Sequence, residues 1–127
     1  MSVQTNLYGL IDQSGLVADY HKYSLWNAEV VQPHWRVLLV RNVQGYTSDK
    51  FSRRHGFSIF GISAINDQDI EGIRTDMEAL VTYLLQNHQF NCIIGVEVVG
   101  DTSGVFQMED GRLYFKFDVT VTSVINS

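Results

Sequence analysis

The sequence predicts a single α+β domain, residues 1–127, in which a mostly antiparallel (mixed) β-sheet packs on one long helix. We expect about four to five strands and a short N-terminal helix, judged from the spacing of apolar runs. Three observations carry this prediction: one strong helical stripe, several strand-like apolar runs, and a hairpin signal near the C-terminus. A chain of 127 residues has the usual size of one domain and buries roughly two-thirds of its unfolded surface.

The N-terminal stretch predicts a short helix. Its apolar residues recur at the spacing of one helix face and are Val3, Leu7, Leu10 and Ile11. Gly15 is a plausible terminator just beyond them. Residues 16–33 carry aromatic side chains without a clean period, so we expect an irregular segment with either a helical turn or an edge strand.

Two strands follow in the middle of the chain. The run from Trp35 to Val40 is apolar on both faces, which is typical of a strand covered on both sides. It ends at Arg41, and we expect a polar, basic loop from Gln44 to Gly56. The next run, Phe57 to Ile65, is again strand-like.

The clearest helix lies between residues 70 and 86. Its apolar stripe is Ile70, Ile73, Met77, Leu80, Val81, Leu84 and Leu85. Asn66 or Asp67 is the expected N-cap, and Asp67, Asp69 and Glu71 suit the positive end of the helix dipole. Asn87 is the expected end.

The C-terminal third predicts a strand, a hairpin and a long final strand. In the first strand one face is expected to hold Cys92, Ile94, Val96 and Val98. The Asp110-Gly111 pair is a strong turn signal because it tolerates positive φ. The final strand alternates, with an inward face of Leu113, Phe115, Phe117, Val119 and Val121. Arg112 begins its outward face.

Charge and composition exclude several classes of function. Acidic residues outnumber basic ones 14 to 9, and a net charge of −5 disfavours binding to nucleic acid or to a membrane surface. The single cysteine, Cys92, cannot form a disulfide within the chain. The first residues lack the basic patch and apolar run of a signal peptide, so we expect none.

No motif in the sequence predicts catalysis. The four histidines stand at unrelated spacings, and there is no phosphate-binding glycine loop. Cys92 lies in an apolar run, where a buried and inert thiol is the default. We therefore expect no enzyme activity, no cofactor and no metal site.

One segment departs from the overall negative charge. The stretch from Gln44 to Gly56 combines aromatic and basic side chains, the candidates for partner contact being Tyr46, Lys50, Phe51, Arg53 and Arg54. One interpretation is a solvated hairpin loop. The other is a contact loop for an acidic partner or a neighbouring copy of the chain. Nucleic acid is a weaker alternative, since the rest of the surface repels it.

The order of segments from residue 34 to 124 resembles a known family. The matching pieces are Val37–Asn42 with Gly45, then Ile59–Ile65 leading into the helix Asp69–Gln86, and last Asp110–Phe115 continuing to Val124. In the order of these elements and in these short sequence segments, the chain resembles the tail terminator (minor tail protein U-like, tail-completion) proteins of long-tailed bacteriophages. That family has no active-site motif to carry over.

The resemblance implies a role in virion assembly. Subunits would form a homohexameric ring on the head-proximal end of the tail tube, stop its polymerisation and offer a surface to the head connector. The partners would be other copies of the chain, the tail tube protein and the connector, with assembly in the host cytoplasm. A ring needs two different patches that meet; the basic loop and the acidic stretch Asp67, Asp69 and Glu71 are the candidates.

Two alternatives remain open at this point. The chain could be a neck or head-completion adaptor on the other side of the same joint, which sequence separates poorly from a tail terminator. It could also belong to a different class, a small-molecule or nucleic-acid binding domain that uses the Gln44–Gly56 segment.

Overall fold

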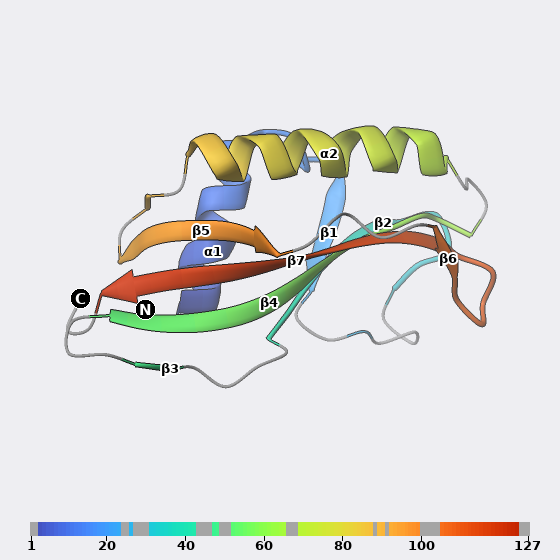
Figure 1. Ribbon diagram of the computed structural model, residues 1–127. Coiled ribbons are helices and arrows are strands. Elements are labelled where there is room, and N and C mark those ends of the chain that lie inside the picture. Colours follow the sequence, from blue (N-terminus) through green and yellow to red (C-terminus); the bar gives the residue numbers. More distant parts are fainter. Residues whose placement is uncertain are drawn as a thin grey trace.

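The computed structural model describes residues 3–23, 26, 31–42, 47–48, 52–65, 69–87, 89–90, 92–99 and 105–124. The elements are α1 (Val3–Gln13), β1 (Tyr20–Tyr23), β2 (Arg36–Asn42), β3 (Thr47–Ser48), β4 (Ser52–Ile62), α2 (Ile70–Gln86), β5 (Ile93–Val99), β6 (Phe106–Gln107) and β7 (Leu113–Val124). The long helix α2 lies along one face of a twisted sheet (Figure 1). The predicted α+β class is confirmed.

The sheet is mixed and mostly antiparallel, as predicted. Five strands run in the order β1-β2-β4-β7-β5, while β3 adds to β4 and β6 adds to β7. Only the β1–β2 pair is parallel among these strands, and Tyr20 lies opposite Arg36 in it. Part of the segment 16–33 is therefore an edge strand, one of the two expected possibilities.

The main core fills the space between the sheet and both helices. The apolar stripe of α2 and the inner face of α1 meet the inward side chains of the sheet in one buried cluster. Leu85 was predicted in this stripe wrongly, because it is 53% exposed. Gly61 in β4 lets α2 approach closely, because a Cβ there would lie 2.8 Å from Sδ of Met77. The alternation predicted for β7 is confirmed, since Phe115, Phe117 and Val119 are buried in this cluster.

Strand β2 is covered on both faces, as its two-sided apolar pattern predicts. Leu38 and Val40 join the main core. Val37 and Leu39 point to the opposite, outer face of the sheet, where they form a second, smaller cluster with Ile62. The fold thus has apolar side chains on the face of the sheet that is turned away from α2.

The structure corrects the predicted loop from residue 44 to 56. Strand β4 begins at Ser52, so Arg53 and Arg54 belong to a strand rather than to a loop. They pair with the short strand β3 on one side and with β7 on the other. The polar composition hid this extension, because β7, which is far away in the chain, holds the segment in the sheet together with the neighbouring strand β3.

The N-cap of α2 also differs from the prediction. The cap is Asp69, whose carboxylate accepts a hydrogen bond from the Gly72 N–H at 3.0 Å. The expected caps Asn66 and Asp67 lie outside the described residues. The predicted end at Asn87 is confirmed, since Asn87 is the C-cap.

A bulge in β5 changes the faces assigned to that strand. The register with β7 shifts between Ile93 and Gly95. As a result Ile93 is buried, with 1% of its surface exposed, whereas Ile94 is 43% exposed. The prediction that placed Ile94 with Val96 was therefore wrong, because an inserted residue reverses the alternation on one side of the bulge.

Candidate functional site

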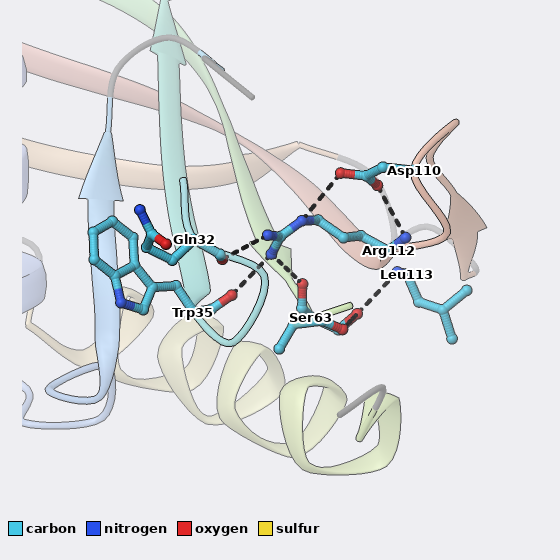
Figure 2. Close-up of polar contacts among 7 residues, drawn as sticks. Gln32, Trp35, Ser63, Asp110, Arg112 and Leu113 are labelled. Atoms are coloured by element: carbon cyan, nitrogen blue, oxygen red, sulfur yellow. Dashed lines mark hydrogen bonds and ion pairs between the residues drawn. The ribbon is translucent and has the colours of Figure 1, made fainter. Parts of the chain in front are cut away.

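The hairpin between β6 and β7 is held to the sheet by a buried arginine, Arg112 (Figure 2). Gly111 makes the predicted turn with a φ of 93°. The outward position predicted for Arg112 was wrong, because its side chain is only 1% exposed. Its guanidinium donates from Nη1 to the carbonyl oxygens of Trp35 and Ser63, both at 2.9 Å. Nη2 donates to the carbonyl oxygen of Gln32 at 2.8 Å.

A carboxylate completes the set of acceptors. Nε of Arg112 donates to Oδ2 of Asp110 at 3.2 Å, and the Arg112 N–H donates to Oδ1 at 3.1 Å. The Ser63 hydroxyl accepts from the Leu113 N–H at 2.9 Å. We call this group the Arg112 clamp. It ties the hairpin to the end of β4 and to the segment before β2, so it fixes three parts of the chain that are distant in sequence.

Next to the clamp, the outer face of the sheet is hollowed. The hollow has a volume of about 520 Å³, and its apolar lining is Trp26, Leu39, Phe60, Ile62, Met108 and Tyr114. Arg41, Glu109 and Asp110 supply charge at its edge. The guanidinium carbon of Arg112 lies 5.3 Å from the Trp26 ring centre, so the clamp also supports one wall. We call this feature the outer hollow.

The basic residues predicted for partner contact lie at the opposite end of the sheet. Arg53 and Arg54 are adjacent in β4, and both are exposed. The other three predicted contact residues, Tyr46, Lys50 and Phe51, lie outside the described residues. Figure 1 shows β3 at one end of the sheet and the β6–β7 hairpin at the other.

The acidic residues at the start of α2 are divided in their roles. Asp69 caps the helix and forms an ion pair with Arg36 at 3.1 Å, so its charge is used within the domain. Glu71 is exposed, and Asp67 lies outside the described residues. The structure therefore does not bring the basic and acidic candidates together within one chain.

A polar bracket joins β1 and β2 to the first half of α2. The Tyr20 hydroxyl donates to Oδ2 of Asp76 at 2.9 Å, and the Arg36 guanidinium lies 4.0 Å from the same carboxylate oxygen. Burial, reinforced by the bond to Asp76, raises the pKa of Tyr20 far above its usual range. The phenol is thus a neutral structural donor and not a candidate base.

The described residues offer no arrangement that points to catalysis. Within them no three His, Cys, Asp or Glu side chains lie close enough to hold a metal ion. Cys92 is buried, and its Sγ accepts from the Asn6 amide at 2.8 Å. His21 stacks on Trp35 with 3.8 Å between ring centres, a packing contact. No helix in the described part of the chain is long and apolar enough to cross a membrane.

Sequence reasoning missed both the clamp and the hollow. The alternation along the last strand predicted that Arg112 lies on the outward face. Nothing in the neighbouring residues indicates that the carbonyl oxygens of Gln32 or Ser63 accept hydrogen bonds from it. The sequence did contain a signal for the hollow, because Leu39 and Phe60 place apolar side chains on the face of the sheet that does not meet α2.

Comparison with protein families decides the identity. The family model described as "Phage tail termination protein" matches residues 1–124. The chain belongs to the phage tail termination protein family. The resemblance seen in the sequence from residue 34 to 124 is therefore confirmed, and the match extends through the N-terminal helix as well.

Among solved structures, this tail termination protein is similar to a chain of the "Virion of native gene transfer agent (GTA) particle". The TM-score is 0.67 at 12% identity, over 98% of this chain and 96% of that chain. At that identity the likeness supports the fold alone. No curated protein matches the sequence closely enough to be compared.

Membership in the tail termination family settles the class of function. The chain is a structural, non-enzymatic component of a phage virion tail, which confirms the expectation that it is not an enzyme. A structural protein of this kind acts through the contacts that its surface makes. The structure offers two that differ in chemistry: the outer hollow at the hairpin end and the exposed basic end of β4.

Proposed function

We propose that this tail termination protein forms a closed ring, with a hexamer expected, on the head-proximal end of the tail tube. The ring stops tube polymerisation and presents a surface for joining to the head. The observation that carries the proposal is the placement of two unlike surfaces at opposite ends of one sheet (Figure 1). A ring of identical subunits needs such a head-to-tail pair, because each contact joins two different patches.

Charge supports the same arrangement. Arg53 and Arg54 are exposed at one end, and Glu109 is exposed at the other, beside Asp110, whose charge is paired with Arg112. A chain with net charge −5 repels its own copies at long range unless local patches of opposite sign meet. Arg53 and Arg54 supply positive charge, which is the minority charge of this chain.

The test combines self-association with capping of tail tubes. Light scattering after size exclusion gives the mass of the purified protein, and negative-stain images with tail tubes show whether a ring closes the tube end. We expect rings and capped tubes of uniform length. A strict monomer that leaves tube growth unchanged would refute the proposal.

A charge-reversed variant tests the basic end directly. Arg53→Glu combined with Arg54→Glu should weaken ring formation or tube capping while the unfolding temperature stays near that of the parent. The control Glu78→Lys reverses an exposed charge on α2 and should assemble normally. Pull-down against tail tubes and against connector-bearing heads separates tube capping from a neck-adaptor role, in which only heads would be retained.

A further inference from the structure

The two borders of the sheet are built differently. Strand β1 is the last strand on one side, and β5 is the last strand on the other (Figure 1). A border strand exposes a row of main-chain N–H and C=O groups that any extended chain can pair with. Soluble proteins therefore usually shorten such a strand, place a lysine on it or cover it with a helix. The β1 border has all three of these protections, and the β5 border has none of them.

The β1 border is closed. The strand has only four residues, one of which is Lys22. Helix α1 covers its end, because the Tyr8 hydroxyl donates to the carbonyl oxygen of Tyr23. Gln4 of α1 donates to the carbonyl oxygen of Val40 in the neighbouring strand β2 at 2.8 Å. Two main-chain acceptors along this border are thus already used within the domain.

The β5 border, meaning the side of β5 that faces away from β7, is open. Among the described strands β5 pairs with β7 alone, so every second residue turns its N–H and C=O away from the sheet. At Ile93 both groups are bonded to Phe90, which closes the first position. Beyond the bulge, Gly95–Val99 keep a regular register with β7 over a length of about 17 Å. Glu97 is the one charged side chain on this stretch.

Exposed apolar side chains gather along the same side of the sheet. Strand β4 pairs with one side of β7 from Tyr114 to Val124, so β5 and β6 both lie on the other side. Among the described residues six large apolar side chains are at least 39% exposed, and four of them lie in β5 or at β6: Ile94, Val99, Val105 and Phe106. The open ladder is therefore flanked by apolar side chains that an added strand would cover.

A second copy of the chain does not fit this border. Two β5 strands that pair with each other are related by a two-fold axis, which closes a pair and not a ring. Pairing centred on the open stretch would also place Glu97 opposite its own copy, where like charges repel. The other described strands with a free side are the closed β1 and the two-residue strands β3 and β6. The occupant that remains is an extended segment of a different protein.

We propose that the β5 border docks an extended segment from the end of the tail tube, which adds to the sheet as one more strand. The inference rests on the proposed function and names the contact through which the ring holds the tube. The proposed ring contact uses the two ends of the sheet, so the β5 border stays free in the ring. Stopping tube growth requires contact with the growing end, so the tube supplies the segment.

The chemistry of the border defines the segment. It pairs through its main chain with Gly95–Val99, places apolar side chains beside Ile94 and Val99, and presents a cation opposite Glu97. The closed β1 border gives the contact a direction, because the subunit can accept a strand on one side of its sheet only. A subunit that pairs at one border cannot pass the pairing on, as a terminating subunit requires.

Lysine placed on the border tests the contact. Ile94→Lys and Val99→Lys put a charge on positions that are 43% and 52% exposed and that a docked strand must cover. Each should lower retention on sedimented tail tubes about tenfold or more, while the ring mass from light scattering and the Tm stay at the parent values. Leu85→Lys is the matched control, because Leu85 is 53% exposed on α2, and it should bind tubes like the parent.

Substitution of Glu97 tests the charge of the segment. Glu97→Lys should weaken tube binding more than Glu97→Gln does, because it brings two cations together. Glu97→Gln should make tube binding less dependent on salt concentration. The control Glu78→Lys reverses an exposed charge on α2 and should leave tube binding unchanged. Equal binding by Glu97→Lys and the parent would overturn the cation assigned to the segment.

Hydrogen exchange followed by mass spectrometry detects main-chain pairing without any substitution. The amides of Gly95–Val99 that face away from β7 should exchange about tenfold more slowly, or slower still, in capped tubes than in free rings. The amides of Tyr20–Tyr23 in β1 are the internal reference and should exchange at the same rate in both. Unchanged exchange in β5 on capped tubes would overturn strand addition.

The outcomes separate this inference from the proposed function. Normal tube binding by both lysine variants would overturn the β5 contact and leave the ring standing. Folded variants that fail to form rings would also overturn it, by showing that the border joins one subunit to the next. Variants that bind tubes but lose connector-bearing heads would overturn it in favour of the head side. A parent protein that is monomeric and ignores tubes would overturn the ring and the tube contact together.

Discussion

Replacing Arg112 with alanine tests how much the clamp contributes to stability. The guanidinium is 1% exposed and donates four hydrogen bonds, three of them to main-chain carbonyls. Arg112→Ala leaves those carbonyls and Oδ2 of Asp110 without this donor, while Oδ1 keeps its bond from the main-chain N–H of residue 112. Each buried acceptor that loses its partner costs about 1–3 kcal/mol.

The net effect is smaller than the sum of these losses, because water enters the vacated space and the hairpin relaxes. The Asp110 side chain is 32% exposed and is hydrated after the change, so the main cost comes from the three main-chain carbonyls. We therefore expect Arg112→Ala to lower the free energy of unfolding by about 3–5 kcal/mol. For a chain of this length that corresponds to a fall in Tm of roughly 10–20 °C.

Urea and thermal unfolding followed by circular dichroism measure the loss. Arg112→Lys should be intermediate, at about 2 kcal/mol, because one ammonium cannot span the acceptors that the planar fork reaches. Arg54→Ala is the matched control, since Arg54 is exposed, and it should change stability by no more than about 0.5 kcal/mol. If Arg112→Ala costs less than about 1 kcal/mol, the clamp does not hold the hairpin in the way argued.

Three other perturbations follow from the fold. Gly61→Ala should destabilise by about 1–3 kcal/mol in thermal unfolding, because its Cβ would lie 2.8 Å from Sδ of Met77; an unchanged Tm would refute this close approach. Asp69→Ala removes the cap on the Gly72 N–H and should cost about 1–2 kcal/mol, whereas Asp69→Asn should recover part of the loss. Burial lowers the pKa of His55, so its protonation favours the unfolded chain. Stability should therefore fall as pH drops below the unfolded value of about 6.5, and His55→Phe should flatten that part of the pH profile.

Much of the architecture could be predicted because its signals are local. The stripe on α2, the alternation in β7 and the Asp110-Gly111 turn each lie within one element, and all three are confirmed, apart from Leu85 at the end of the stripe, which is 53% exposed. Where the prediction failed, the missing information was non-local. Arg53 and Arg54 join the sheet because the distant strand β7 pairs with them on one side, in addition to the nearby strand β3, and β7 is not visible in their own composition.

The candidate surfaces also include features that the sequence predicts and features that depend on contacts between distant segments. The sequence by itself determined the family, the long helix, the final strand and an unusual concentration of basic and aromatic residues. Only the tertiary structure decided that Arg112 is buried, since its acceptors on Gln32, Trp35 and Ser63 come from segments at least 49 residues away in the chain. A local sequence pattern predicts which side chains share a face of one element. It does not predict which main-chain carbonyls from distant segments will lie against that face, and those contacts form the Arg112 clamp and the wall of the outer hollow.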